Sequence, residues 1–462
     1  MIDIKDTIAA IATPIGNSGI GIIRISGDDA VRISDEIIRS RSGESLDLFS
    51  SPSHTIHYGY VYDGDRIVDE ILVSVMRAPR SYTSEDTVEI NCHGGMFVMN
   101  EVLSLVISHG ARLARVGEFT ERAFLNGRID LSQAEAVMDL ISSENEFSRS
   151  NSISQIKGSV RDKIGGMREK IIHEAAFIEA ALDDPENYQI DDDYKDTLSS
   201  LIDEISDEIR SLLKDAESVR YLRNGIDTVI AGRPNVGKSS LMNLFAGYEK
   251  AIVTSLPGTT RDILEEKISI DGLILNLIDT AGLHDTIDEV ESIGIERART
   301  EMEKADLVLY VIDSSDDLKE DDEIFMKDMI GSSCIIILNK TDLGCRIDPD
   351  HLKDISKAPV VEISVKEETG IDELKEMIKD LFCKDMIKDS RRAYITNKRQ
   401  TEKLKDALSS LEEVMQSVKN SMTEDTFTID MMDAYHSLGS IIGEDVSDDL
   451  ADRIFSEFCM GK

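Results

Sequence analysis

The stretch Gly232-Arg233-Pro234-Asn235-Val236-Gly237-Lys238-Ser239 decides the fold of this chain. The apolar run 227–231 precedes it, and residues 240–247 follow it with the pattern of a helix. Strand, glycine-bounded loop and helix in this order predict a phosphate-binding P-loop, because successive backbone N–H groups can then face an anion. We expect Lys238 to reach the β- and γ-phosphates and Ser239 to ligate Mg²⁺. An isolated match also arises by chance in a glycine turn, so the interpretation depends on further motifs.

Two motifs that follow the P-loop match the switch segments of a nucleotide hydrolase. Asp279-Thr280-Ala281-Gly282 comes directly after the apolar run 273–278. Its aspartate is expected to hold the Mg²⁺ shell, and the N–H of its glycine to sense the γ-phosphate. Gly258-Thr259-Thr260 supplies the switch threonine, Thr260, whose hydroxyl completes the Mg²⁺ sphere.

The base-reading motif is Asn339-Lys340-Thr341-Asp342, which follows the apolar run 334–338. A carboxylate here accepts hydrogen bonds from guanine N1–H and the exocyclic amine, which adenine does not present at those positions. Leaving such an acceptor unpaired is expensive, so Asp342 is expected to select GTP over ATP. Together the motifs predict a guanine-nucleotide-binding α/β domain. The residues expected at the nucleotide are Asn235, Val236, Gly237, Lys238, Ser239, Ser240, Thr254, Ser255, Leu256, Pro257, Gly258, Thr259, Thr260, Asp279, Thr280, Ala281, Gly282, Asn339, Lys340, Asp342, Ser364, Val365 and Lys366.

Length and composition limit the class of protein. A chain of 462 residues can hold two or three domains, each with its own core. No apolar run approaches the roughly 20 residues that span a bilayer, and the five cysteines are scattered without metal-ligand spacing, so we expect a cytoplasmic protein. The net charge of −39 argues against a non-specific nucleic-acid binder, although a local basic patch remains open.

The chain reads as four consecutive segments. Residues 1–118 look like a mixed α/β domain, with strands at 7–13 and 19–26, a hairpin of 54–62 with 67–77, a strand at 87–91 before a tight turn at His93-Gly94-Gly95, and helices at 28–39 and 96–108. Apolar residues at three- and four-residue spacing predict helices in 119–222 and again in 384–462, at 391–418 and from Met431 onward. The nucleotide domain, 223–383, is therefore expected to be inserted into a helical domain and held out on short linkers.

Several short stretches of the sequence allow both a structural and a functional interpretation. The acidic run around Asp191-Asp192-Asp193 is expected to be a solvated connection. The basic stretch Arg391-Arg392 with Lys398-Arg399 favours a solvated helix face over a contact with RNA phosphates. We expect Met431-Met432 in a core, and Cys92-His93 in packing rather than at a metal.

Motifs spread over the chain resemble the MnmE (TrmE) family of tRNA-modification GTPases along essentially its full length. Besides the P-loop form with Asn235, they are Thr13-Pro14 with Gly19-Ile20-Gly21-Ile22-Ile23-Arg24-Ile25-Ser26-Gly27, Gly117-Glu118-Phe119-Thr120-Glu121-Arg122-Ala123-Phe124-Leu125-Asn126-Gly127, Pro257-Gly258-Thr259-Thr260-Arg261-Asp262, Ile293-Gly294-Ile295-Glu296-Arg297-Ala298 and the terminal Phe458-Cys459-Met460-Gly461-Lys462.

The resemblance implies an architecture and a reaction. The fold class would be multidomain: an α+β folate-binding N-terminal domain that dimerises, an all-α helical domain and an inserted Ras-like GTPase domain. With a flavin-dependent partner, MnmG (GidA), in a heterotetramer, such a homodimer installs a carboxymethylaminomethyl-type group on the wobble uridine of tRNA. A tetrahydrofolate derivative is the one-carbon source, and the GTPase domains meet across the dimer when GTP and K⁺ bind.

The resemblance also assigns residues. The folate positions fall on Arg24, Glu89, Arg128 and Lys462, where a carboxylate reads the pterin edge and cations meet the glutamate tail. Cys459 matches a cysteine important for modification, although a small packed hydrophobe explains it equally well. Leu283 stands where other GTPases carry the water-orienting glutamine, and Glu291 matches the acid that replaces it. K⁺ would take the place of an arginine finger, with ligands from Asn235, Thr254, Leu256 and Thr259.

Two other functions are compatible with parts of the sequence. One is a regulatory GTPase, such as a ribosome-assembly switch, that performs no modification chemistry. The other is a folate-dependent one-carbon transferase in which GTP binding is vestigial. The terminal segment 459–462 argues against the first, and the complete nucleotide motif set with Glu291 argues against the second.

Overall fold

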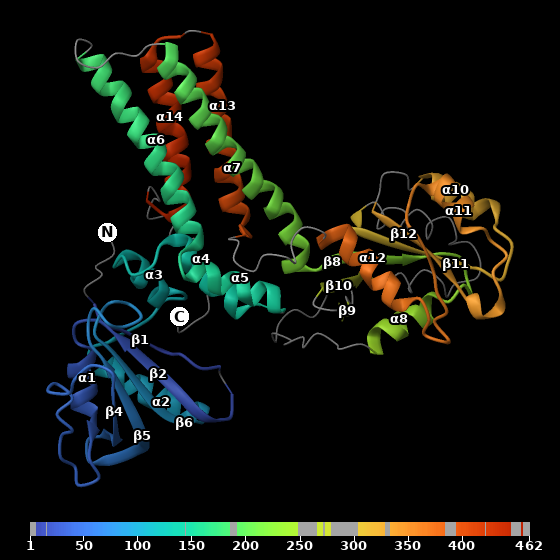
Figure 1. Cartoon of the computed structure of the whole chain (residues 1–462). Coiled ribbons are helices and arrows are strands. Elements are labelled where there is room, and N and C mark those ends of the chain that lie inside the picture. Colours follow the sequence, from blue (N-terminus) through green and yellow to red (C-terminus); the bar gives the residue numbers. More distant parts are fainter. Residues whose placement is uncertain are drawn as a thin grey trace, which may run out of the picture. The chain divides into compact units, whose positions relative to one another are not determined.

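A computed structural model describes residues 6–14, 16–143, 145–184, 192–247, 266–270, 273–278, 304–328, 333–383, 394–420, 422–444 and 454–455 (Figure 1). The chain forms two compact units. Unit 1 comprises Met1–Met138, Gln155–Gln189 and Met422–Lys462, and unit 2 comprises Asp139–Ser154 and Ile190–Ser421. The first two boundaries along the chain fall inside continuous helices, α4 (Leu131–Ile141) and α5 (Glu146–Ile156).

Unit 1 contains, among the described residues, a seven-stranded sheet with the order β3-β4-β5-β6-β2-β1-β7. Neighbouring strands run antiparallel except β1 and β7, which are parallel. The elements are β1 (Ile8–Ile11), β2 (Ser18–Ser26), α1 (Ala30–Ile37), β3 (Ile38–Arg39), β4 (Thr55–Asp63), β5 (Arg66–Met76), β6 (Thr87–Gly94), α2 (Met96–Ser108), β7 (Arg112–Leu113) and α3 (Glu118–Leu125).

The two faces of this sheet are covered differently. Ala9 of β1 belongs to the core shared with α1 and α2, whereas its neighbours Ile8 and Ala10 pack with Phe119 of α3. This alternation is the period-two pattern of a strand, so α3 lies against the face opposite α1 and α2. Arg24 faces Ala10 and Glu89 in the strand register, which places Arg24 and Glu89 beside α3.

The predicted tight turn at His93-Gly94-Gly95 is wrong. Strand β6 continues to Gly94, which pairs with Ser18, and the helix starts directly after Gly95. A Cβ at Gly94 would collide with the Ser18 side chain, so this glycine allows two backbones to approach rather than a turn. Cys92 is buried in the core, as the packing interpretation predicted.

The helices of unit 1 after α4 pack as a pair, α6 (Ser159–Asp183) with α14 (Glu424–Ile442). The buried Arg168 guanidinium of α6 lies over the ring of Tyr435 at 4.0 Å and pairs with Glu444 at 2.6 Å. Met431 is fully buried, which confirms its prediction as a core residue. Helix α14 begins earlier than predicted, at Glu424, and stops at Gly443, whose φ of 91° ends the helical hydrogen bonding.

Unit 2 contains the predicted nucleotide domain. Its described strands form a six-stranded sheet with the order β13-β12-β11-β8-β10-β9, parallel except for the β9–β10 pair. Apolar clusters cover the strands on both faces, as expected for a parallel sheet flanked by helices. The elements are β8 (Ile226–Ala231), α8 (Lys238–Gly247), β9 (Glu266–Ile270), β10 (Leu273–Ile278), β11 (Leu307–Asp313), α10 (Glu320–Asp328), β12 (Cys334–Asn339), η2 (Thr341–Leu343), α11 (Pro349–Ser356), β13 (Val360–Glu362) and α12 (Ile371–Cys383).

Two further described helices of unit 2, α7 (Asp192–Asn224) and α13 (Lys398–Lys419), pack against each other. Gly225 alone separates α7 from β8, so no separate linker holds the domain out at this end. The last turns of α7 are part of the nucleotide-domain core, because Val219 is fully buried there and Tyr221 meets Phe382 edge-on at 4.9 Å. The domain therefore continues directly from the helix.

The sequence predicted a helix from residue 391 onward, and this is wrong for residues 394–397, the first part of that range that the structure describes. Residues 394–397 are not helical, and α13 begins at Lys398. Asn397 has an extended backbone and accepts a hydrogen bond from the Arg399 N–H at 2.8 Å, so it acts as the N-cap. No helix in the described part of the chain is long and apolar enough to cross a membrane.

Candidate nucleotide and ligand sites

The phosphate loop joins β8 to α8, as the sequence predicts. Gly232 has φ 140° and a Cβ there would collide with the carbonyl oxygen of Val311. Gly237 has φ 108° and a Cβ there would collide with Asn339. Both positions therefore require glycine for conformation as well as for space.

Lys238 lies folded over the loop that it belongs to. Its Nζ donates to the carbonyl oxygens of Gly232 and Arg233, both at 2.7 Å. Burial lowers the pKa of this amine from its usual value of 10.5. Ser239 and Ser240 occupy the exposed first turn of α8. An ammonium at the mouth of the loop, beside the N-terminus of a helix, suits a phosphate.

Asn339 and Lys340 connect the base-reading loop to the phosphate loop. The Asn339 amide is 2 % exposed; it donates to the Val236 carbonyl oxygen at 2.9 Å and accepts from the Val365 N–H at 3.1 Å. Lys340 Nζ donates to the Asn235 carbonyl oxygen at 2.7 Å and to Asp313 at 2.6 Å. Burial would raise the pKa of Asp313, but the hydrogen bonds from Lys340 and Ser315 outweigh it and leave the pKa below 3.8.

Asp342 is held in place at one carboxylate oxygen. The Ser364 hydroxyl donates to Asp342 Oδ1 at 2.7 Å and itself accepts from the Glu367 N–H at 3.2 Å. Lys366 Nζ is 4.0 Å from Oδ2. Ser364 thus orients the carboxylate by donating to one of its oxygens. A carboxylate has about four acceptor positions, so capacity remains for the donors of a guanine edge.

The switch segments predicted from the sequence lie outside the described residues. They comprise Thr254, Ser255, Leu256, Pro257, Gly258, Thr259 and Thr260, then Asp279, Thr280, Ala281, Gly282 and Glu291. Cys459 and Lys462 are also outside the described part.

A second group of predicted residues meets on the α3 side of the unit 1 sheet. Arg24 of β2 donates from Nε to Glu89 of β6 at 2.8 Å, and both side chains remain partly exposed. The Arg24 guanidinium lies 5.7 Å from the ring centre of Tyr82, and that of Arg128 lies 5.1 Å from the same ring. Two of the predicted residues, Arg24 and Arg128, therefore converge on one tyrosine, and the third, Glu89, joins them through Arg24.

Sequence reasoning missed Tyr82. Its hydroxyl is 2.9 Å from the Thr120 hydroxyl of α3, and the next residue, Thr83, accepts from Asn126 at 2.7 Å. Arg122, whose side chain is 3 % exposed, donates to Asp6 and Glu85, so the 81–86 loop is fixed to α3. A lone aromatic residue in a polar loop was the available signal, but nothing in the sequence connected it to Arg24.

Cys92 and His93 lie on opposite faces of β6. Burial raises the pKa of the Cys92 thiol to about 11, and its S–H points to the Gly21 carbonyl oxygen at 3.4 Å. The Asp69 carboxylate, whose Oδ1 accepts from His93 Nδ1 at 2.6 Å, raises the pKa of exposed His93. Within the described ranges no group of three or more His, Cys, Asp and Glu side chains could hold a metal ion.

Comparison with known proteins agrees with this arrangement. The family profile "GTP-binding protein TrmE N-terminus" matches residues 7–128, and "MnmE helical domain" matches residues 131–459. A tRNA modification GTPase MnmE from Lachnoclostridium phytofermentans is 48 % identical over 460 residues, covering 99 % of both chains. The chain belongs to the MnmE family of tRNA modification GTPases.

Other MnmE proteins are similar over the same length. The one from Lactobacillus acidophilus is 45 % identical, covering 99 % of this chain and 98 % of its own. The one from Geobacillus kaustophilus is also 45 % identical and covers 99 % of both chains. The predicted family, the multidomain fold class and the GTPase enzyme class are thereby confirmed. The predicted domain boundaries and the roles of individual residues stay predictions.

Proposed function

We propose that this tRNA modification GTPase works with a flavin-dependent partner, the MnmG (GidA) type, to place a carboxymethylaminomethyl-type group on the wobble uridine of tRNA. A tetrahydrofolate derivative would supply the one-carbon unit. The proposal is supported by the presence, in one MnmE-family chain, of a phosphate loop with an oriented Asp342 and of a separate cluster of Arg24, Glu89 and Arg128.

The nucleotide site is proposed to bind and cleave GTP. Asp342 would accept from the guanine edge, and Lys238 would leave the carbonyl oxygens of its own loop to meet the β- and γ-phosphates. That exchange is favourable because an anion offers the ammonium a stronger partner than a neutral carbonyl. Glu291, acting through a bridging water, would orient the attacking water molecule.

The loop chemistry fits the proposed ions. Ser239 and Thr260 are hydroxyl ligands of the kind Mg²⁺ prefers. For K⁺ the ligands would be Asn235 with Thr254, Leu256 and Thr259; Asn235 has φ 66°, and its side chain is exposed at the loop. When bound, the two cations supply positive charge where negative charge accumulates during phosphoryl transfer.

The second cluster is proposed to bind the folate. Glu89 would accept from the amine and amide edge of the pterin, and Arg24 already aligns its carboxylate. Arg128 and Lys462 would meet the negatively charged glutamate tail. Cys459 would act close by in the modification chemistry.

The assembly is proposed to be a cytoplasmic homodimer joined by its N-terminal domains, residues 1–118. The inserted GTPase domains, residues 223–383, would meet across the dimer when GTP and K⁺ bind, and the two helical parts, residues 119–222 and 384–462, would carry the movement. The flavoprotein partner would complete a heterotetramer that acts on tRNA.

Mass analysis of tRNA nucleosides tests the proposal. The purified chain is incubated with a partner flavoprotein, GTP, Mg²⁺, K⁺ and a tetrahydrofolate derivative, and the tRNA is then digested. We expect the modified uridine only in the complete mixture, and not when K⁺ is replaced by Na⁺. GTP hydrolysis without any modified uridine in the complete mixture would contradict the proposal and favour a regulatory GTPase.

A further inference from the structure

Tyr394, the first described residue after the nucleotide domain, is built into unit 2 from two sides. It is 4 % exposed and belongs to the same apolar cluster as strands β8 and β10 and helix α12. Its ring lies 5.5 Å from that of Phe147 in the first turn of α5. The chain leaving the nucleotide domain is thus packed against α5 rather than free.

Asn151 of α5 holds the backbone of Tyr394. Its Oδ1 accepts from the Tyr394 N–H and its Nδ2 donates to the Tyr394 carbonyl oxygen, both at 3.3 Å. The amide is 6 % exposed, so removing it would break two hydrogen bonds to the backbone of a buried residue. An alanine at this position has no side-chain donor or acceptor that could replace these two hydrogen bonds.

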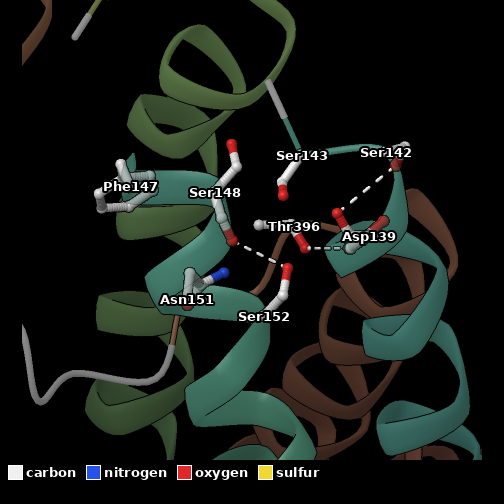
Figure 2. Close-up of a pocket in the computed structure, with 8 residues that line it drawn as sticks. All are labelled: Asp139, Ser142, Ser143, Phe147, Ser148, Asn151, Ser152 and Thr396. Atoms are coloured by element: carbon white, nitrogen blue, oxygen red, sulfur yellow. Dashed lines mark hydrogen bonds between the residues drawn. The ribbon is translucent and has the colours of Figure 1, made fainter. Parts of the chain in front are cut away.

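Next to this contact the structure is polar and incompletely filled. Figure 2 shows Ser148, Asn151 and Ser152 along α5, with Thr396 and Asp139 across from them; Thr396 Oγ1 donates to Asp139 Oδ2 at 3.1 Å. A cavity of about 20 Å³ lies here, enough for one water molecule. The Ser148 hydroxyl is buried and has no partner among the described residues. On this polar side of the contact, hydrogen bonds can be exchanged with a water molecule.

The other end of α5 is also fixed by a side-chain amide. Gln133 of α4 donates from Nε2 to the Ile156 carbonyl oxygen at 2.7 Å and accepts from the Asp130 N–H at 2.9 Å. Asp130 is two residues beyond Arg128, whose guanidinium lies over Tyr82. One continuous helix therefore contacts the exit of the nucleotide domain at one end and the segment after Arg128 at the other.

We propose that α5 transmits the nucleotide-dependent movement toward the Arg24–Glu89–Arg128 cluster, and that Asn151 and Gln133 are positioning residues for this coupling. Neither touches the phosphate loop or the base-reading loop in any described contact, so each would act on modification through α5 and not on GTP cleavage itself. The inference rests on the proposed function, because it concerns the link between its two halves.

The test compares Asn151→Ala and Gln133→Ala with a control, Ser154→Ala, on the same helix. Three quantities are measured on the full chain: GTP hydrolysis, modified uridine formed per GTP with partner and tRNA, and hydrogen exchange of the Tyr394 amide. We expect hydrolysis to stay within about twofold and modification per GTP to fall about tenfold in both variants, a size usual for coupling between sites. Exchange at Tyr394 should accelerate in Asn151→Ala, and the control should match the unaltered chain.

Two results would overturn the inference. One is unchanged modification per GTP in Asn151→Ala although Tyr394 exchanges faster. The other is an equal loss of hydrolysis and modification, which indicates general damage. If Asn151→Ala unfolds under the assay conditions, Asn151→Asp, which keeps the acceptor for the Tyr394 N–H, takes its place. Modified uridine formed per GTP is then measured for that variant in the same way. Failure of the proposed function is separate, because the unaltered chain would then form no modified uridine.

Discussion

The nucleotide site and the Arg24–Glu89–Arg128 cluster are built in opposite ways. In the nucleotide site, side chains are positioned by backbone groups of adjacent loops, as with Asn339 on Val236 and Lys340 on Asn235. In the cluster, side chains from β2 and the segment after α3 meet at one ring, and a side chain from β6 joins them through Arg24. A site whose side chains are held by loop backbone appears in the sequence as short contiguous motifs. A site whose side chains hold one another appears only as single residues far apart in the sequence.

The largest effect should come from the base-reading carboxylate. Changing Asp342→Asn removes the acceptor for two guanine donors, so GTP affinity should fall about 10⁴-fold. Xanthosine triphosphate, which has a carbonyl where guanine has its amine, should bind instead, because an amide can donate to it. Titration of both nucleotides by calorimetry measures the switch, and unchanged preference for GTP would show that Asp342 does not read the base.

The next effect concerns stability in unit 1. Arg122→Met leaves Glu118 and its neighbours without their buried cation, so the free energy of unfolding should fall by about 3–5 kcal/mol. Chemical denaturation followed by a probe in unit 1 measures this. The matched control is Arg32→Met, since Arg32 pairs on the surface with Asp29 and Glu36 and should change little. Equal losses in the two variants would argue against a special role for the buried pair.

A smaller effect is expected at the Arg24–Glu89–Arg128 cluster, the proposed folate site. Glu89→Gln should weaken binding of a tetrahydrofolate derivative about tenfold to a hundredfold, the value of about 1.5–3 kcal/mol for a charge-assisted hydrogen bond. GTP hydrolysis should not change. Glu70→Gln, which alters a carboxylate bonded to Tyr58 on β5, is the control. If both variants bind folate like the unaltered chain, the ligand does not use Glu89.

The smallest effect is a dependence on pH. Burial would raise the pKa of Glu118, but hydrogen bonds from Arg112 and the Arg115 N–H outweigh it and hold the pKa below 4.5. A lowered pKa in the folded state means that the carboxylate stabilises the fold above the unfolded value, and that this contribution is lost as the pH falls below about 4.5. In Glu118→Gln the free energy of unfolding, measured by chemical denaturation at a series of pH values, should fall less steeply below about pH 4.5 than in the unaltered chain. The same pH dependence in both proteins would contradict a lowered pKa at Glu118.

The same contrast explains what could be predicted from the sequence. The order of β8, the phosphate loop and α8, and the end of β12 at Asn339, follow from local patterns that the structure reproduces. Tyr82 could not be predicted, because its position depends on Thr120, thirty-eight residues away. The non-helical run before Lys398 was also missed, since its backbone is held by Asn151 far back in the chain.

The central claim is that cleavage of a guanine nucleotide in unit 2 drives tRNA modification that uses unit 1. The most direct measurement is tRNA nucleoside analysis with the Asp342→Asn variant, the partner flavoprotein, folate, Mg²⁺ and K⁺. The account predicts modified uridine with xanthosine triphosphate and none with GTP. Modification that ignores the nucleotide supplied, or xanthosine triphosphate hydrolysis that yields no modified uridine, would contradict it.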